Sequence, residues 1–197
     1  MAESSSDSPS MLIGKIASGD FPTYFVSFIA NNSTKEILLS RAFFPPPPMS
    51  GSTFQGQSSK FATSLAVFRD LFWIAFVANN VNGDLLTSYS TDSGFTWTAN
   101  NTVNQSSKAA PSMAAFNSQL WLAFIANNSS DDLLVCSSSD GMNWSPNTRV
   151  NQSSKTAPSL AFDGYKLWLA FVANNSTNDV LLCSSPDGIS WSNNMTI

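Results

Sequence analysis

Apolar residues recur along this chain in four similar runs, and a short polar stretch follows each run. Almost every position in a run is apolar, which is typical of a strand covered on both faces. Each run ends in Ala-Asn-Asn. The alanines are Ala30, Ala78, Ala126 and Ala173, so successive copies lie 48, 48 and 47 residues apart. A repeat of this length predicts a β-propeller blade of four strands.

The rest of each repeat supplies the other strands of a blade. APSLAFDG (157–164), KLWLAFVA (166–173) and DVLLCSS (179–185) are short apolar runs separated by turn residues. WSPNTRVNQ (144–152) is more polar, as expected of the outermost strand. No segment has a sustained helical period, so we expect an all-β protein.

Four repeats account for almost the whole chain. We expect a flexible segment over 1–10 and then one propeller domain over 11–197, with an inner strand over 11–18 that is the weakest. The predicted blades are 11–57, 58–105, 106–152 and 153–197. We expect a compact four-bladed ring like that of the hemopexin fold. The alternative is a larger ring that a second chain completes in a homodimer.

The two cysteines follow the repeat. Cys136 and Cys183 take the position that Ser40 and Ser88 hold in earlier repeats, so we expect free buried thiols, consistent with a reducing compartment. The first ten residues, MAESSSDSPS, lack the apolar core of a signal peptide, and no apolar run is long enough to span a membrane. The expected location is the cytoplasm, or outside the cell after leaderless release.

Charged residues make up only 11% of the chain, so Ser, Asn and Thr provide most of its polar surface. Such a surface has many hydrogen-bonding groups and little electrostatic field, which suits neutral ligands. Nine Lys and Arg against 13 Asp and Glu give a net charge of −4 without a basic stripe, which argues against nucleic acid as a partner. The chain has no His and no dedicated calcium-loop spacing, so we expect neither a metal nor a cofactor.

A turn motif follows the third strand of three repeats. STDSGFTW (90–97) fits the pattern S-x-D-x-G-x-T-W, and SSDGMNW (138–144) and SPDGISW (185–191) are one residue shorter. The motif resembles the Asp box of sialidase-type propellers, in which Asp accepts backbone N–H groups and Gly takes a positive φ. The first repeat departs from it, with RAFFPPPPMSGSTF (41–54), whose prolines predict an extended excursion.

The blade pattern over residues 11–197, rich in Trp, Asn and Ser, resembles that of leaderless fungal and bacterial propeller lectins. The resemblance implies multivalent carbohydrate binding without catalysis, often of N-acetylated sugars such as GlcNAc, with glycans or glycoproteins as partners and agglutination as an activity. A protein-interaction or structural propeller that binds no sugar is the alternative.

Catalysis is not expected. A sialidase needs a cluster of three arginines, but Arg41, Arg69 and Arg149 stand at unlike positions of the repeat. A retaining glycosidase needs two carboxylates about 5 Å apart. The polar residues of this chain instead follow the repeat, which favours several equivalent weak sites that gain avidity together.

The candidate sites combine two polar elements that strand direction places on one rim. One is the Ala-Asn-Asn turn with its following acid, and the other is the connector to the next blade, VNQSSK at 103–108 and 150–155 or GQSSK at 56–60. Their amides and carboxylates suit sugar hydroxyls and acetamido groups, although the same residues suit turn formation. The candidate residues are Asn79, Asn80, Asp84, Gln105, Ser106 and Lys108; Asn127, Asn128, Asp132, Gln152, Ser153 and Lys155; Asn32, Glu36, Gln57, Ser58 and Lys60; and Asn174, Asn175 and Asp179, which have no connector.

Overall fold

The computed structural model describes residues 7–14, 23–43 and 50–197. Within them, sixteen strands form four antiparallel sheets of four strands, each in chain order, which confirms the predicted blades. No helix in these ranges is long and apolar enough to cross a membrane. The strands are β1 (Ser10–Gly14), β2 (Thr23–Ile29), β3 (Glu36–Phe43) and β4 (Ser50–Ser58) in blade 1; β5 (Ser64–Phe68), β6 (Leu71–Val77), β7 (Asp84–Ser90) and β8 (Asn101–Ser106) in blade 2; β9 (Ser112–Phe116), β10 (Gln119–Ile125), β11 (Asp132–Ser138) and β12 (Thr148–Ser153) in blade 3; and β13 (Ser159–Phe162), β14 (Leu167–Val172), β15 (Val180–Ser185) and β16 (Met195–Thr196) in blade 4.

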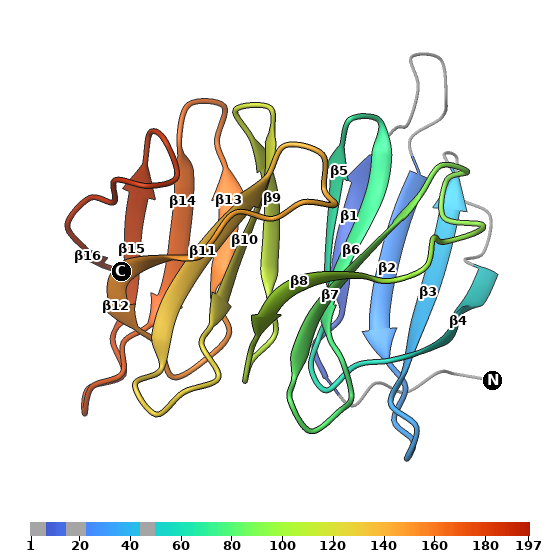
Figure 1. Ribbon diagram of the computed structural model, residues 1–197, viewed down its shortest axis with the longest axis horizontal. Coiled ribbons are helices and arrows are strands. Elements are labelled where there is room, and N and C mark those ends of the chain that lie inside the picture. Colours follow the sequence, from blue (N-terminus) through green and yellow to red (C-terminus); the bar gives the residue numbers. More distant parts are fainter. Residues whose placement is uncertain (1–6, 15–22, 44–49) are drawn as a thin grey trace.

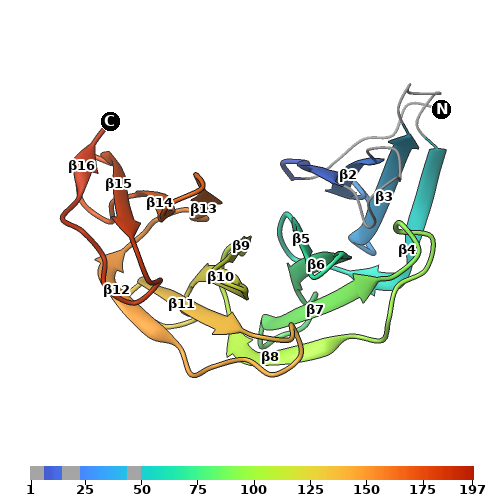
Figure 2. The ribbon, with the colours of Figure 1, turned by 90° about the horizontal axis from the view of Figure 1, so that it is seen from above.

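The four blades stand side by side in chain order (Figure 1), and the first strands of blades 2, 3 and 4 lie innermost (Figure 2). Seen from above, they form an open arc, and blades 1 and 4 lie on either side of its opening (Figure 2). The closed four-bladed ring is therefore wrong for the described residues. Packing between neighbouring blades sets the angle between them, and the steps from blade 1 to blade 4 do not bring the two ends together.

Blades 2 and 3 are packed on both faces. On β6, Phe72, Ile74 and Phe76 pack against blade 1, whereas Trp73 and Val77 on the opposite face pack against blade 3. None of these five side chains is more than 1% exposed. The nearly continuous apolar run of β6 thus serves two interfaces at once, which explains why it shows no alternation of apolar and polar residues.

The aromatic residue near the start of each second strand lies on the face toward the next blade. Phe25, Trp73 and Trp121 are 1%, 1% and 6% exposed, so all three are buried between blades. Trp168 is only half-buried, because its face of blade 4 has no described blade beside it.

Three turns connect the third strand to the fourth in blades 2, 3 and 4. They are the segments 90–97, 138–144 and 185–191, called Asp turns below. In blade 3, the N–H groups of Met142 and Asn143 both donate to Asp140 Oδ1 at 2.8 Å. Gly141 has φ 79°, and a Cβ there would collide with the indole of Trp73 in the preceding blade. Each Asp turn therefore also clamps the neighbouring blade. Gly94 lies against Phe25 and Gly188 against Trp121 in the same way.

Hydrogen bonds hold the Asp-turn carboxylates in their charged form. Hydrogen bonds lower the pKa of Asp187 to about 2. The largest effect comes from the backbone N–H of Ser190, and the next from the backbone N–H of Ile189. The Asn143 backbone N–H lowers the pKa of Asp140 below its usual range. At Asp92 partial burial acts in the opposite direction, but the bonds from Thr96 and Ser90 outweigh it and the pKa is lowered.

Several smaller expectations are settled by the described residues. Cys136 and Cys183 are free and buried, as predicted. The last strands of blades 1 to 3 end at Ser58, Ser106 and Ser153. Inside the segment 41–54, residues 41–43 continue β3 and 50–54 belong to β4, while the four prolines lie outside the described residues.

Candidate functional site

The second Asn of each Ala-Asn-Asn triplet builds its own turn. Asn80 Oδ1 accepts the N–H of Gly83 at 2.8 Å, and Asn80 Nδ2 donates to Asp84 Oδ2 at 2.8 Å. These bonds form an Asx turn, which fixes the loop before the third strand begins. The turn-forming alternative therefore applies to this residue in every repeat. Asn128 donates likewise to Asp132, Asn175 donates to Asp179, and Asn32 accepts from the N–H of Lys35.

The first Asn of two triplets reaches the preceding blade. Asn127 Nδ2 donates to the carbonyl oxygen of Asn82 at 2.9 Å, and Asn174 Nδ2 donates to Asp131 Oδ2 at 2.8 Å. The main-chain N–H groups of Asn79 and Asn174 reach the preceding connector. These contacts join neighbouring turns along the rim.

The VNQSSK connector joins the fourth strand of one blade, the third strand beside it and the second strand of the next blade. Val103 is buried in blade 2, Asn104 takes φ 57° in a bulge of β8, and Ser106 pairs with Asp84 across the sheet. Ser107 then forms an isolated bridge with the Ala of the next triplet and is 1% exposed. The verbatim repetition of this segment is thus explained by its role as a joint. Ser59 and Ser154 make the corresponding bridges to Ala78 and Ala173.

The connector lysines bind the Ala-Asn-Asn turn of the following blade. The sequence had predicted instead that they pair with the turn of the preceding blade. Lys108 Nζ donates to the carbonyl oxygen of Asn128 at 2.6 Å and forms an ion pair with Asp131. Lys155 Nζ donates to the carbonyl oxygen of Asn175 at 2.6 Å. The polypeptide passes from one blade to the next before the lysine, which therefore starts beside the next turn. Lys60 reaches the carbonyl oxygen of Val81 in the same manner.

Two shallow polar hollows bring the remaining candidates together on the outer strands of blades 2 and 3. The blade 2 hollow encloses about 410 Å³ and contains Asp84, Gln105 and Ser106. The blade 3 hollow encloses about 390 Å³ and contains Asp132, Gln152 and Ser153. Equivalent residues therefore line two equivalent hollows. Thr102 and Asn104 complete the first, and Ser130, Arg149 and Asn151 complete the second.

Some polar groups that line the two hollows, and their counterparts in blade 1, already bond to other residues of the protein. Gln105 Oε1 accepts a hydrogen bond from Asn147 Nδ2 of the next blade at 2.6 Å. Gln57 accepts from Asn100 in the same way. Asp132, which is 8% exposed, accepts from Arg149. In blade 1, Glu36 pairs with Ser58 across the sheet. The hollows are polar and partly preorganised by these bonds.

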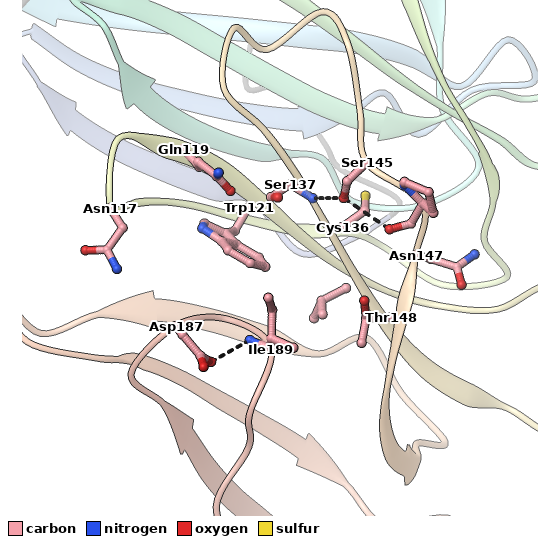
Figure 3. Close-up of a pocket in the computed structure, with 12 residues that line it drawn as sticks. Asn117, Gln119, Trp121, Cys136, Ser137, Ser145, Asn147, Thr148, Asp187 and Ile189 are labelled. Atoms are coloured by element: carbon pink, nitrogen blue, oxygen red, sulfur yellow. Dashed lines mark hydrogen bonds between the residues drawn. The ribbon is translucent and has the colours of Figure 1, made fainter.

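A larger pocket lies between blades 3 and 4 on the rim of the Asp turns, and sequence reasoning missed it. This blade 3–4 pocket has a volume of about 510 Å³. In Figure 3, Trp121 lies between Gln119 on one side and Ile189 of the blade 4 Asp turn on the other. The side-chain amides of Asn117 and Gln119 make no hydrogen bond to a described residue. The lining is Asn117, Gln119, Trp121, Val135, Cys136, Ser137, Ser145, Pro146, Asn147, Thr148, Asp187 and Ile189.

Small and polar residues of blade 3 leave the space over Trp121 open. In blade 2, Tyr89 packs against Trp73 with ring centroids 4.9 Å apart and ring planes tilted by 38°, and Leu71 begins β6. The equivalent positions in blade 3 are Ser137 and Gln119, so the space over Trp121 is unfilled and lined by polar groups. Blade 2 is the exception in this respect, because Ser184 takes the position of Ser137 in blade 4.

Two titratable groups line the blade 3–4 pocket. Burial raises the pKa of the Cys136 thiol to about 12, so it remains protonated and unreactive. Asp187 is held charged by its Asp turn, as described above. Among the described residues no group of three or more His, Cys, Asp or Glu could hold a metal ion.

Comparison with known proteins defines the fold class. No protein-family description matches the chain, and no curated protein matches it in sequence. Solved structures do match. A Hadza microbial sialidase, Hz136, shares 15% identity with a TM-score of 0.66, over 94% of this chain and 45% of that chain. The catalytic domain of a Coprinopsis cinerea GH62 α-L-arabinofuranosidase shares 14% identity with a TM-score of 0.65, over 94% of this chain and 66% of that one.

A fungal lectin is also similar. Aleuria aurantia lectin, a six-bladed β-propeller with a fucose recognition mode, shares 12% identity and a TM-score of 0.67, over 96% of this chain and 60% of the lectin. This chain is thus a β-propeller whose structural neighbours include sialidases, other glycoside hydrolases and lectins. It spans less than two thirds of the length of these three neighbours.

Proposed function

We propose that this protein is a multivalent lectin without catalytic activity. The observation that carries the proposal is the blade 3–4 pocket. Its volume of about 510 Å³ is within the range of small-ligand sites, and an apolar floor of Trp121, Val135 and Ile189 is surrounded by amides and hydroxyls. A sugar ring is complementary to this lining, because its C–H face is apolar and its edge carries hydroxyl groups.

The two polar hollows support multivalency. They repeat the same lining of Asp, Gln and Ser in blades 2 and 3, so one chain offers two equivalent surfaces besides the pocket. Individually weak sugar sites on one molecule gain avidity on a surface dense with glycans. This is the basis on which we expect agglutination.

The carboxylates of the blade 3–4 pocket favour binding over hydrolysis. A retaining glycosidase requires two carboxyl groups, one of which donates a proton from a raised pKa. Asp187 is the one carboxylate in the lining, and the N–H groups of Ile189 and Ser190 occupy its Oδ1. A pKa of about 2 makes it a poor proton donor.

We assign the ligands to N-acetylated sugars such as GlcNAc. The free amides of Asn117 and Gln119 can pair with an acetamido group, and Ile189 offers an apolar contact for its methyl. The three Asp turns, with their Asp-to-amide bonds, support placing the chain beside Asp-box propeller lectins. A sialidase and a lectin with a fucose recognition mode among the structural neighbours support sugar binding in general.

A glycan array tests the proposal, and a variant that fills the pocket tests the site. Ser137→Tyr introduces into blade 3 the residue type that packs against Trp73 in blade 2, where Tyr89 stands at the equivalent position. We expect array binding by the wild type and at least a tenfold weaker affinity in this variant, with an unchanged fold. Ser184→Tyr is the matched control, because Ser184 is the equivalent residue of blade 4 and does not line the pocket. A blank array with folded wild type contradicts the lectin assignment.

The alternative is a propeller that binds a protein partner without sugar. Its discriminating result is a captured partner that free GlcNAc and free fucose fail to compete, combined with a blank array.

A further inference from the structure

The two ends of the arc carry opposite halves of an interface that this chain already makes three times. The outer face of blade 4, directed away from blade 3, repeats the apolar set that blades 2 and 3 bury against their next neighbour. In blade 3, Trp121, Ala123, Ile125, Leu133 and Val135 are at most 6% exposed. Their counterparts in blade 4 are Trp168, Ala170, Val172, Val180 and Leu182, which are half-buried or exposed, with Val180 at 44%.

The outer face of blade 1 carries the complementary half. In blade 3, the face toward blade 2 is formed by Met113, Leu120, Leu122, Phe124 and Leu134, all buried. The counterparts on blade 1 are Met11, Tyr24, Val26, Phe28 and Leu38, which are half-buried, or exposed in the case of Met11 at 68%.

A hydrogen-bonding group repeats along with the apolar residues. Ser64 Oγ accepts the N–H of Met113 at 2.9 Å, and Ser112 Oγ accepts the N–H of Leu160 at 2.9 Å, each linking one inner strand to the next. Ser159 is the counterpart in blade 4, and it is exposed. The residue that corresponds to Met113 and Leu160 in blade 1 is Met11.

We propose that two copies of this chain associate head to tail, with the outer face of blade 4 of one copy against the outer face of blade 1 of the other. The occupant is a second copy because one chain presents both halves of the interface, and the equivalents of these halves pack against each other between its neighbouring blades. Unlike faces meet, so the contact is heterologous. The proposal is independent of sugar binding, which uses the rims.

Light scattering coupled to size exclusion tests the proposal with one arginine on each face. Ala170→Arg charges the blade 4 face and Val26→Arg charges the blade 1 face, while Val81→Arg places the same charge on a turn that is 96% exposed. We expect the wild type and Val81→Arg to have the mass of two or more chains, and each face variant alone the mass of one. Circular dichroism confirms that the variants are folded.

Mixing the two face variants provides the deciding measurement. Each retains one intact and complementary face, so the mixture is expected to give a species of two chains and nothing larger. A wild type that remains a single chain at its highest soluble concentration overturns the proposal. It is also overturned if the mixture stays monomeric, or if only one of the two face variants dissociates the assembly.

Discussion

Replacing Gly141 by Ala tests whether the Asp turns clamp the preceding blade. Gly141 has φ 79°, and a Cβ at this position would lie under 3.0 Å from three atoms of the Trp73 ring. Trp73 is 1% exposed and is packed between blades 2 and 3, so the ring has little room to move away. Two costs therefore act together, a strained backbone and an overpacked core.

The size of the effect follows from these two costs. A left-handed conformation costs a residue with a Cβ about 1–2 kcal/mol, and overpacking a well-packed core costs about 1–3 kcal/mol. We expect Gly141→Ala to lower the free energy of unfolding by about 2–5 kcal/mol. Gly56→Ala is the matched control, because Gly56 has φ 69° with no heavy atom within 4 Å of a Cβ. It should lose only the backbone contribution, about 1–2 kcal/mol.

Urea unfolding followed by tryptophan fluorescence measures both changes. A double-mutant cycle with Trp73→Phe adds a second criterion, because phenylalanine lacks the part of the indole that meets the new Cβ. In that background Gly141→Ala should cost about as much as Gly56→Ala, which gives a coupling energy of about 1–3 kcal/mol. Equal losses for Gly141→Ala and Gly56→Ala in the wild type would refute the clamp.

Three further outcomes are expected. The pKa of Asp187 is lowered to about 2 and that of Asp140 is also lowered, so the charged forms of both carboxylates stabilise the fold above the ordinary pKa of 3.8. This contribution is lost as the pH falls from 3.8 toward 2. Urea midpoints measured across this range should therefore decline, and they should decline less steeply in Asp187→Asn. Cys136 and Cys183, whose pKa values burial raises to about 12 and about 11, should react with a thiol reagent only after unfolding, so rapid labelling of the native protein would contradict their burial. Lys108→Met should lower stability by at most about 1 kcal/mol, as for a partly exposed ion pair, and leave glycan affinity unchanged; a loss of affinity would return Lys108 to the binding site.

Much of the fold could be predicted from the sequence because a repeat constrains every copy at once. The apolar runs before Ala30, Ala78, Ala126 and Ala173 predicted the second strand of each blade, and the structure has β2, β6, β10 and β14 there. The Asp turns were predicted because a short motif fixes a turn through bonds between near neighbours in the chain, such as those of Asp140.

The candidate site was predicted less well. The hollows do combine Asp84 with Gln105 and Ser106, because these residues face each other across one sheet. The direction of Lys108 was wrong, since its partner depends on where the next blade lies. The blade 3–4 pocket was missed because it arises from Ser137, a small residue that shows its effect only beside Trp121 and a turn from another blade.

The sequence by itself determined the number of blades, their strands and their turns, because local hydrogen bonds and side-chain period specify these features within each repeat. The opening of the arc, the half-buried state of Trp168 and the pocket over Trp121 were decided only by the tertiary structure. These features depend on the angle between blades and on contacts between residues about one repeat apart. No local pattern encodes such an angle, because it is the sum of the packing between whole faces.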